Sequence, residues 1–391
     1  MIKFVNAILR SISRHENPSK LLEKHSSPQM NIVPWIFEEF SKDWGLDATA
    51  KIANQFMKEP FIDLSIKHPF AYSDQQKDER KDHLEKLSEQ LLQEQGRAEE
   101  SDSIDSNKIL DIKESGKDVV VLPHGLLRTK KIGGDLKKWP LYDQGVWWVQ
   151  DASSALAAIA LINRLVQFPN TDEEGNQNPL KDMHVVDMCS APGGKCAQLL
   201  SNGVGKVTAI EANARRSRRL QENLTRLGFS GSDQSSIIVS PGQDWVPSKD
   251  DIIHGVLLDV PCSATGTGSK RPDVLRKSED GMNELVQIQE TLANHCADSV
   301  LKPGGIMVYA TCSLLKRESE DQIHKLLMRG TKKKDNEKIG VMKTVPFTAG
   351  EIPGYDGAID ENGWLRVLPG SLKGELESCD GFFVARLMKA E

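Results

Sequence analysis

Two cysteines occupy positions where thiol chemistry is possible. Cys262 follows the apolar run 254–259 (HGVLLD), and Cys312 follows the apolar run 305–310 (GIMVYA). Such runs predict buried strands, and open α/β sheets place their functional groups at the carboxyl ends of the strands. A lone cysteine after a strand is usually a small buried residue. Two cysteines on one edge of the sheet indicate a function. Because neither belongs to a CxxC pair, nucleophilic or acid–base chemistry fits better than redox exchange.

A glycine-containing turn follows another apolar run. The segment 188–195 (MCSAPGGK) lies between a predicted strand and a predicted helix that begins near Gly194. Glycines let the backbone approach a ligand, and a helix N-terminus offers unpaired N–H groups. Glu211 ends the next predicted strand, where a carboxylate is expected to bind ribose hydroxyls. Because the segment lacks the GK[ST] signature of a phosphate-binding loop, we predict a nucleoside site; an ordinary tight turn is the alternative.

Strands alternate with helices from about residue 146 onward. Apolar, β-branched segments predict the strands, and the segments between them have helical spacing. This alternation predicts an α/β fold with a Rossmann-like, doubly wound and mostly parallel sheet. Strands are expected at 184–188, 206–210, 236–239, 254–259, 305–310 and 382–388, and helices at 152–165, 194–201, 214–227, 283–301 and 317–328.

The preceding region, 31–145, is predicted to form a smaller α+β unit. Residues 73–118 contain 14 acids and 8 bases, which is typical of a solvated acidic insert; only 84–92 has helical spacing. Outside this insert, helices are expected at 34–44 and 48–58, and strands at 61–66 and 119–123.

Composition excludes several classes of protein. Among 391 residues no apolar run approaches the roughly 20 residues that span a bilayer, so no membrane association is expected. Six cysteines without Cys/His ligand spacing predict neither a disulfide scaffold nor a metal site. The net charge of −6 equals the excess of the acidic insert, 14 acids against 8 bases. Bases exceed acids locally at 128–138, 206–226 and 270–277, which are candidate contacts for nucleic-acid phosphates.

The first residues form an amphipathic segment. Its apolar face is flanked by Lys3, Arg10 and Arg14, and no acid precedes Glu16. A basic presequence for an organelle and an ordinary packing helix both fit this pattern. Periodicity alone does not separate the two interpretations.

Three motifs carry a resemblance to a known family. MCSAPGGK (188–195), LLDVPCSATG (257–266) and YATCS (309–313) resemble, in this order, the motifs of RNA (cytosine-5) methyltransferases that use S-adenosyl-L-methionine. Within that family the chain is most similar to the bacterial 16S ribosomal RNA enzymes of the RsmB, Sun or Fmu type. Three further segments support this resemblance: WWVQDASSALA (147–157), KRPDVLRK (270–277) and DGFFVARLMK (380–389).

The resemblance implies a domain organisation. Residues 146–391 resemble the catalytic domain strongly, and 31–145 resemble an N-terminal RNA-binding region more weakly. The segment FVNAILRSISR within 1–30 resembles the last helix of a NusB-like RNA-binding domain, most of which is absent from this sequence. That likeness favours the packing helix, with the presequence as the alternative.

The resemblance also implies the catalytic roles. Cys312 would be the nucleophile that attacks C6 of cytosine, and Cys262 would assist breakdown of the covalent adduct. Asp259 would hydrogen-bond the N3/N4 edge of the base. Lys195 would help to position these groups.

The cofactor would be S-adenosyl-L-methionine, with no metal. Glu211 would bind its ribose hydroxyls. Asp244 would face its adenine, unless a one-residue shift puts Gln243 there. The other implied cofactor contacts are Asp259 and the loop residues Cys189, Ser190, Ala191, Pro192, Gly193, Gly194 and Lys195.

Two details accompany the resemblance. Ser190 and Cys196 replace the Ala and Thr that the family usually has, and both changes exchange one small side chain for another, so we predict that Cys196 is a packing residue. Trp147 and Trp148 would either stack on a flipped base or anchor the core, and the core role is favoured.

The expected partner is single-stranded or loop RNA, because chemistry on C5 requires the base to leave its stack. Ribosomal RNA is the favoured substrate and transfer RNA the rival. DNA cytosine-5 methyltransferases lack the second cysteine, so Cys312 argues against them. A non-catalytic ribosomal RNA-binding assembly factor is the alternative of a different class. We expect a monomer, in the cytoplasm or in a plastid or mitochondrion.

Overall fold

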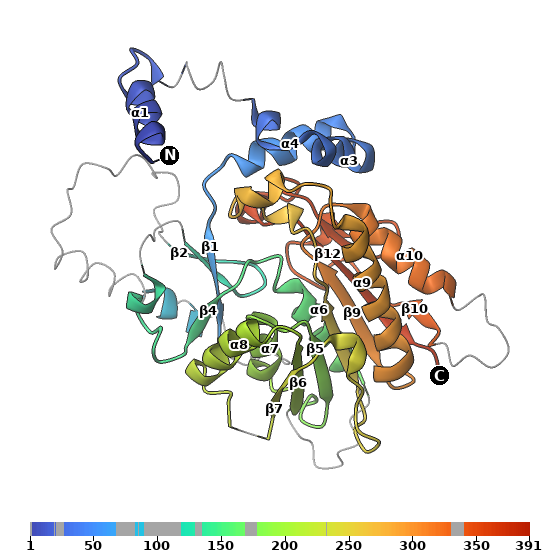
Figure 1. Ribbon diagram of the computed structural model, residues 1–391. Coiled ribbons are helices and arrows are strands. Elements are labelled where there is room, and N and C mark those ends of the chain that lie inside the picture. The colour runs from blue at the N-terminus through green and yellow to red at the C-terminus, as the bar shows by residue number, and fades with distance from the viewer. Residues whose placement is uncertain are drawn as a thin grey trace.

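Two β-sheets with surrounding helices make up the part of the chain that the structure describes (Figure 1). The computed structural model describes residues 2–18, 20, 27–67, 83, 84, 86–89, 119–129, 135–168, 178–231, 233–329 and 340–391. The smaller sheet comes from residues 62–149, and the larger sheet comes from residues 184–389.

The larger sheet has the strand order β10-β12-β9-β8-β5-β6-β7, and β11 pairs with β12. Neighbours from β9 to β7 are parallel, whereas β12 runs antiparallel to its three partners. The chain builds β6 and β7 on one side of β5 and then crosses to build β8 and β9 on the other. Open α/β sheets bind ligands at such a reversal. The strands are β5 (His184–Met188), β6 (Lys206–Glu211), β7 (Ser235–Val239), β8 (Gly255–Asp259), β9 (Ile306–Thr311), β10 (Met342–Thr344), β11 (Leu365–Val367) and β12 (Phe382–Lys389).

Helices cover both faces of this sheet, because successive side chains of a strand point to opposite faces. Val185 belongs to the apolar cluster under α6, α7 and α8, and its neighbour Val186 belongs to the cluster under α9 and α10. Figure 1 shows the resulting three layers. The helices are α6 (Leu156–Leu165), α7 (Gly194–Ser201), α8 (Ala214–Arg226), α9 (Met282–His295) with a π-helical extension (Cys296–Val300), and α10 (Glu320–Arg329).

The smaller sheet is antiparallel throughout, in the order β2-β3-β1-β4. Leu64, Leu127 and Trp147 form the centre of its apolar cluster. Its strands are β1 (Ile62–Ile66), β2 (Val119–Val121), β3 (Leu127–Thr129) and β4 (Trp147–Val149).

The N-terminal helices α3 (Pro34–Trp44) and α4 (Leu46–Phe56) pack against the loops that follow β8 and β9. Phe40 shares an apolar cluster with Leu275 and Leu314. The indole Nε1 of Trp44 donates to the carbonyl of Leu314 at 2.8 Å. The two helices therefore support the segments that carry the cysteines.

The remaining regular elements are one N-terminal helix and several short turns of 3₁₀ helix. They are α1 (Ile2–Ser13), η1 (Pro28–Asn31), η2 (Leu136–Lys138), η3 (Gly242–Asp244), η4 (Thr265–Thr267), η5 (Pro272–Arg276), η7 (Lys316–Glu318), η8 (Asp356–Ala358) and η9 (Gly374–Ser378). Within the described residues, no helix has the length and apolarity needed to cross a membrane.

The predicted α/β fold class is confirmed. The six predicted strands of the catalytic region are β5 to β9 and β12, and the five predicted helices are α6 to α10. α6 begins only at Leu156, because turns precede it, and α10 begins at Glu320, because η7 precedes it. The strands β3, β4, β10 and β11 were not predicted, because each has three residues, too few to show an alternating pattern.

The N-terminal region follows its predictions with one addition. The predicted helices are α3 and α4, and the predicted strands are β1 and β2. β4 follows the predicted boundary at 146 yet pairs with β1, so the smaller sheet takes its last strand from beyond that boundary. Of the predicted helix 84–92, the described residues 84 and 86–89 are helical, and most of the acidic insert lies outside the described residues. The domain boundaries stay predictions.

Truncating Phe40 tests whether α3 belongs to the folded core. Phe40 is fully buried, so Phe40→Ala should lower the free energy of unfolding by about 3–5 kcal/mol. Leu46→Ala on α4 is the control, because Leu46 is 68% exposed and its loss should change stability by no more than about 0.5 kcal/mol. Urea unfolding followed by tryptophan fluorescence measures both. Equal midpoints would contradict the packing.

Candidate active site

The two cysteines meet at the carboxyl edge of the larger sheet. Cys262 lies three residues after β8, and Cys312 directly follows β9. Their Sγ atoms are 3.5 Å apart, and both side chains are free thiols that are partly exposed. The structure therefore brings the two thiols together, as their positions in the sequence predict.

A pocket of about 430 Å³ opens beside Cys312, between the two sheets. Three site residues of the larger sheet region reach it: Lys195, Asp259 and Cys312. The rest of the lining comes mainly from the smaller sheet and the loops beside it: Pro60, Phe61, Ile62, Asp63, Val149, Gln150, Asp151, Ser153, Ser154, Thr267, Lys270, Asp380 and Phe382.

An ion pair joins two of the predicted catalytic residues. Nζ of Lys195 is 2.7 Å from Oδ2 of Asp259 and also donates to Oγ of Ser154 at 3.1 Å. Burial lowers the pKa of Lys195, but the Asp259 carboxylate outweighs burial and leaves that pKa above its usual value. Lys195 is therefore a fixed cation on the pocket wall.

The Cys312 thiol is held in its protonated form. Contact with the Cys262 thiol and burial raise the pKa of Cys312 well above its usual value, while the nearby Lys195 ammonium acts in the opposite direction. The thiolate is the nucleophile in cysteine chemistry. Attack by Cys312 consequently requires the loss of its proton when a substrate is in place.

The loop between β5 and α7 is held by hydrogen bonds from its neighbours. The backbone N–H of Ser190 donates to the carbonyl of Ile210 at 2.9 Å, and Arg216 Nη2 donates to the carbonyl of Ala191 at 2.7 Å. Asn223 Nδ2 donates to the carbonyl of Pro192 at 2.8 Å.

Glycine is required at the end of this loop. Gly193 has a φ of 102°, and a Cβ atom there would lie 2.6 Å from Cδ1 of Leu220. Gly193 is the N-cap of α7 and has no side chain to satisfy the first turn, so N–H groups of that turn remain available to a ligand. The predicted nucleoside loop therefore has the expected strand–turn–helix context.

Glu211 ends β6 at the same edge of the sheet. Its Oε2 accepts from the backbone N–H of Ala191 at 3.3 Å, and its Oε1 accepts from the N–H of Asn213 at 2.9 Å. Arg216 Nη1 approaches Oε2 at 3.4 Å, and Glu211 is only 1% exposed. Glu211 therefore lies beside the loop at 189–194 with its carboxylate held by two backbone N–H groups and Arg216.

Asp187 lies beneath the same loop and was missed in the sequence analysis. It is fully buried, and Ser190 Oγ donates to its Oδ2 at 2.6 Å, while its Oδ1 has no partner. Burial raises the pKa of Asp187 to about 7. Asp187 therefore fixes the loop from beneath through its hydrogen bond with Ser190.

The predicted adenine contact stays open. Asp244 and Gln243 are both exposed in the turn η3, which lies near the end of β5: a Cβ atom on Gly242 would be 2.7 Å from Sδ of Met188. The structure does not separate the two candidates, and Asp244 remains a prediction.

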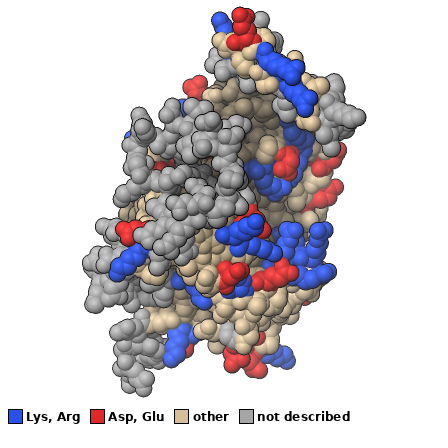
Figure 2. All heavy atoms as spheres, turned by 90° about the vertical axis from the view of Figure 1, so that its left-hand side faces the viewer, with Lys and Arg blue, Asp and Glu red and all other residues tan. Residues whose placement is uncertain are grey.

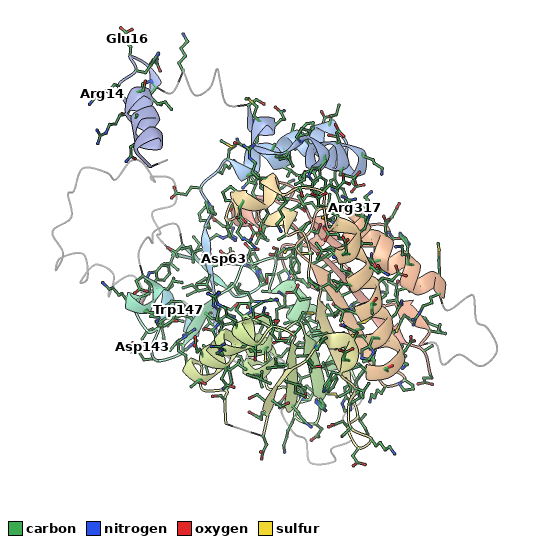
Figure 3. The ribbon with its side chains drawn as sticks, in the orientation of Figure 1. Arg14, Glu16, Asp63, Asp143, Trp147 and Arg317 are labelled. Atoms are coloured by element: carbon green, nitrogen blue, oxygen red, sulfur yellow. The ribbon has the colours of Figure 1, made fainter. Side chains whose placement is uncertain are left out.

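The tryptophan pair has a structural role. Trp147 is fully buried and its Nε1 donates to the carbonyl of Pro140 at 2.8 Å; Trp148 is 5% exposed and its Nε1 donates to Oε1 of Gln150 at 2.7 Å. Figure 3 shows Trp147 beside Asp143 in the region of the smaller sheet. The favoured core role is confirmed, and base stacking by this pair is excluded. Cys196 is also fully buried, as predicted.

A group of buried charges on the pocket wall was also missed. Lys270 Nζ forms ion pairs with Asp151 and, at 3.0 Å, with Asp380. The Lys270 ammonium overcomes burial and lowers the pKa of Asp151 to about 2, whereas burial and the Asp151 charge raise the pKa of Asp380 to about 7. All three lie in segments that carry the family resemblance. The sequence predicted phosphate contacts for 270–277, whereas Lys270 of that segment is paired with two carboxylates of the protein itself.

Asp63, which lines the pocket, could have been identified from the sequence. A carboxylate in the apolar run FIDLSI is unusual in a strand, and the structure shows Asp63 bound by Arg128 through Nε at 2.6 Å and Nη2 at 2.7 Å. Asp63 Oδ2 also accepts from the backbone N–H of Ala152 at 2.9 Å. This pair connects the smaller sheet to the turn that precedes α6.

Basic side chains gather on the face formed by α8 and the smaller sheet (Figure 2). The arginines Arg215, Arg218 and Arg219 of α8 are exposed, and the lysines Lys137 and Lys138 of η2 are exposed as well. The predicted basic segments 206–226 and 128–138 thus contribute to the surface beside the loop at 189–194.

Comparisons with known proteins agree with the geometry. The sequence model of a family described as 16S rRNA methyltransferase RsmB/F matches residues 176–388, more than half of the chain. The ribosomal RNA small subunit methyltransferase B of Shewanella oneidensis is 32% identical over 259 residues, which cover 66% of this chain and 51% of that protein. The probable ribosomal RNA small subunit methyltransferase B of Synechocystis is 29% identical over 398 residues, which cover 99% of this chain and 74% of that protein. The chain therefore spans about half the length of the Shewanella relative.

Solved structures share the fold. A methyltransferase homologue from Pyrococcus horikoshii has a TM-score of 0.61 at 20% identity, covering 93% of this chain and 97% of that one. NSun6 from Pyrococcus horikoshii, solved with SFG, has a TM-score of 0.61 at 18% identity, covering 93% of this chain and all of that one. At these identities the likeness concerns the fold alone.

Replacing Asp187 by Asn tests the buried carboxyl. With a folded pKa of about 7 against an ordinary value of 3.8, the folded protein retains a proton that the unfolded chain has released. The stability contributed by this group is therefore complete below about pH 4 and is lost as the pH rises to about 7. Asp187→Asn lacks this loss, so its free energy of unfolding should rise relative to wild type across that range. A difference independent of pH in urea unfolding would contradict the assignment.

Proposed function

Since the chain belongs to the 16S rRNA methyltransferase RsmB/F family, we propose that it transfers a methyl group from S-adenosyl-L-methionine to carbon 5 of a cytosine in RNA. The observation that carries the proposal is the 3.5 Å contact of Cys262 with Cys312, beside the Lys195–Asp259 pair. Cys312 and Asp259 on the pocket wall supply a nucleophile and a group that recognises a base, and the Cys262 thiol in contact with Cys312 supplies a second proton carrier.

Cysteine is needed because C5 of cytosine is a poor nucleophile. When Sγ of Cys312 bonds to C6, the 5,6 double bond opens and its electron pair makes C5 nucleophilic. The bound cofactor supplies an electrophilic methyl group that C5 then takes. A base takes the C5 proton, the C5–H electron pair re-forms the 5,6 double bond, and the Sγ–C6 bond breaks to return Cys312 as a thiolate.

The neighbouring residues handle the base and the protons. Asp259 hydrogen-bonds the N3/N4 edge, which stabilises the protonated adduct, and Lys195 holds the Asp259 carboxylate in place at 2.7 Å. Cys262, in contact with the Cys312 sulfur, assists breakdown of the adduct. Contact with Cys262 and burial raise the pKa of Cys312 well above its usual value, so its thiol has to lose a proton before it attacks.

The cofactor is assigned to the loop at 189–195, together with Glu211, Asp244 and Asp259. The free N–H groups at the start of α7, the unpaired Oδ1 of Asp187 and the glycine at 193 support this assignment. SFG, a cofactor analogue, is present in the structure of NSun6 from Pyrococcus horikoshii, which supports the same use of the fold.

The proposed substrate is small-subunit ribosomal RNA. The names of the Shewanella and Synechocystis relatives support this choice over transfer RNA. The target cytosine has to leave its stack to enter a pocket of about 430 Å³, so a loop or an unpaired stretch is the expected target.

Methyl transfer from radiolabelled S-adenosylmethionine to unmodified small-subunit RNA tests the roles of the cysteines. Cys312→Ala should abolish transfer, because it removes the nucleophile. Cys262→Ala should accumulate a covalent RNA–protein complex, because adduct breakdown is impaired. Cys296→Ala is the matched control: Cys296 is fully buried in the π-helical extension of α9 and does not line the pocket, so its loss should leave transfer intact.

Four outcomes would count against the proposal. Transfer by Cys312→Ala would refute the nucleophile, and a Cys262→Ala variant without adduct would refute the release role. Transfer only to transfer RNA would change the substrate, and no transfer to any RNA would favour a binding factor without catalytic activity.

A further inference from the structure

Glu318 is a buried carboxylate between the two cysteine loops. It ends the turn η7 between β9 and α10 and is fully buried. Its backbone is fixed, because the Tyr309 hydroxyl donates to its carbonyl at 2.8 Å. Its neighbour Arg317 lies below α3, with the guanidinium 5.5 Å from the ring centroid of Trp35 (Figure 3). The Glu318 side chain consequently points into the protein.

Four hydrogen bonds converge on this carboxylate. Oε1 accepts from the backbone N–H of Ser263 at 2.9 Å and from Nε2 of Gln289 at 3.0 Å. Oε2 accepts from the hydroxyls of Ser263 and Ser313, each at 2.5 Å. A buried carboxylate is costly unless such donors surround it, so the carboxylate and its donors hold one another in a single arrangement.

The partners of Glu318 are the direct neighbours of the two thiols. Ser263 follows Cys262, and Ser313 follows Cys312. Gln289 on α9 extends the network by donating from the same Nε2 to the carbonyl of Pro261 at 2.9 Å, which precedes Cys262. The Glu318 side chain thus ties the exit of β8 to the exit of β9.

We propose that Glu318 is a positioning residue that sets the contact between Cys262 and Cys312 through Ser263 and Ser313. Its role in the reaction rests on the proposed function, because Cys312 must meet C6 along a narrow path while Cys262 stays within reach of the adduct. Misplacement of a reacting group by about 1 Å costs roughly 100-fold in rate.

Disulfide formation measures the sulfur–sulfur contact without any RNA. Diamide oxidises two neighbouring thiols to a disulfide and takes up the two hydrogen atoms, and mass spectrometry of a digest identifies the peptides joined. Glu318→Gln keeps the shape of the side chain, but its amide nitrogen cannot accept from a hydroxyl, so the link between the loops weakens. The Cys262–Cys312 disulfide should then form at least about tenfold more slowly than in wild type.

Glu351→Gln is the matched control. The Glu351 carboxylate also belongs to a buried ion pair, in which its Oε1 is 2.5 Å from Nη1 of Arg386, but it does not contact either cysteine loop. It should lose stability and keep the wild-type rate of disulfide formation. A wild-type rate in Glu318→Gln would overturn the proposal, as would an equally slow rate in Glu351→Gln.

Kinetics supplies the second readout. With small-subunit RNA, Glu318→Gln should lower kcat by roughly 100-fold and leave KM for RNA within about threefold, because the RNA contacts are intact. If wild type methylates no RNA, the proposed function fails, whereas the disulfide rates still decide whether Glu318 positions the thiols.

A double variant covers the case in which Glu318→Gln does not fold. Ser263→Ala with Ser313→Ala retains the carboxylate and removes both hydroxyl links. The same slow disulfide formation supports the proposal, and a wild-type rate overturns it.

Discussion

The parallel pairing of β8 with β9 is the constraint on which the site depends. Asp259 lies opposite Ala310 in this pairing, so the residues that follow the two strands leave the sheet side by side. Cys262 is three positions beyond Asp259, and Cys312 is two positions beyond Ala310, which brings the sulfurs within 3.5 Å. A register shift of one residue would turn the side chains of one strand to the opposite face and separate the thiols.

Charged side chains and the packing of neighbouring elements complete the site at this edge of the larger sheet. The thiol contact keeps Cys312 protonated at rest, and the Lys195–Asp259 pair provides opposite charges on the same wall. The helices α3 and α4 cover the cysteine loops from outside, and the smaller sheet closes the other side of the pocket. Although it precedes the larger sheet in sequence, the N-terminal region is therefore part of the site.

Apolar patterns in the sequence predicted the longer strands of the larger sheet. The sequence did not predict the short strands β3 and β4 of the smaller sheet or the side-chain contacts of the site. Runs such as HVVDM and GVLLD are buried on both faces, and their apolar composition predicted β5 and β8. The three-residue strands β3 and β4 depend on pairing with β1, and no local sequence pattern predicts that pairing. Glu318 appeared as one acid in a charged segment, and only the folded chain places it among four donors. Lys270 is held at the pocket by ion pairs with Asp151 and Asp380, which are distant from it in the sequence.

The covalent role of Cys312 is the central claim, and trapping with a modified RNA tests it most directly. An RNA with 5-fluorocytidine at the target position has no C5 proton to lose, so the enzyme should remain bonded to it after methyl transfer. Digestion and mass spectrometry then identify the modified peptide. The nucleotide should be attached to Cys312, and attachment to Cys262 instead would contradict the account.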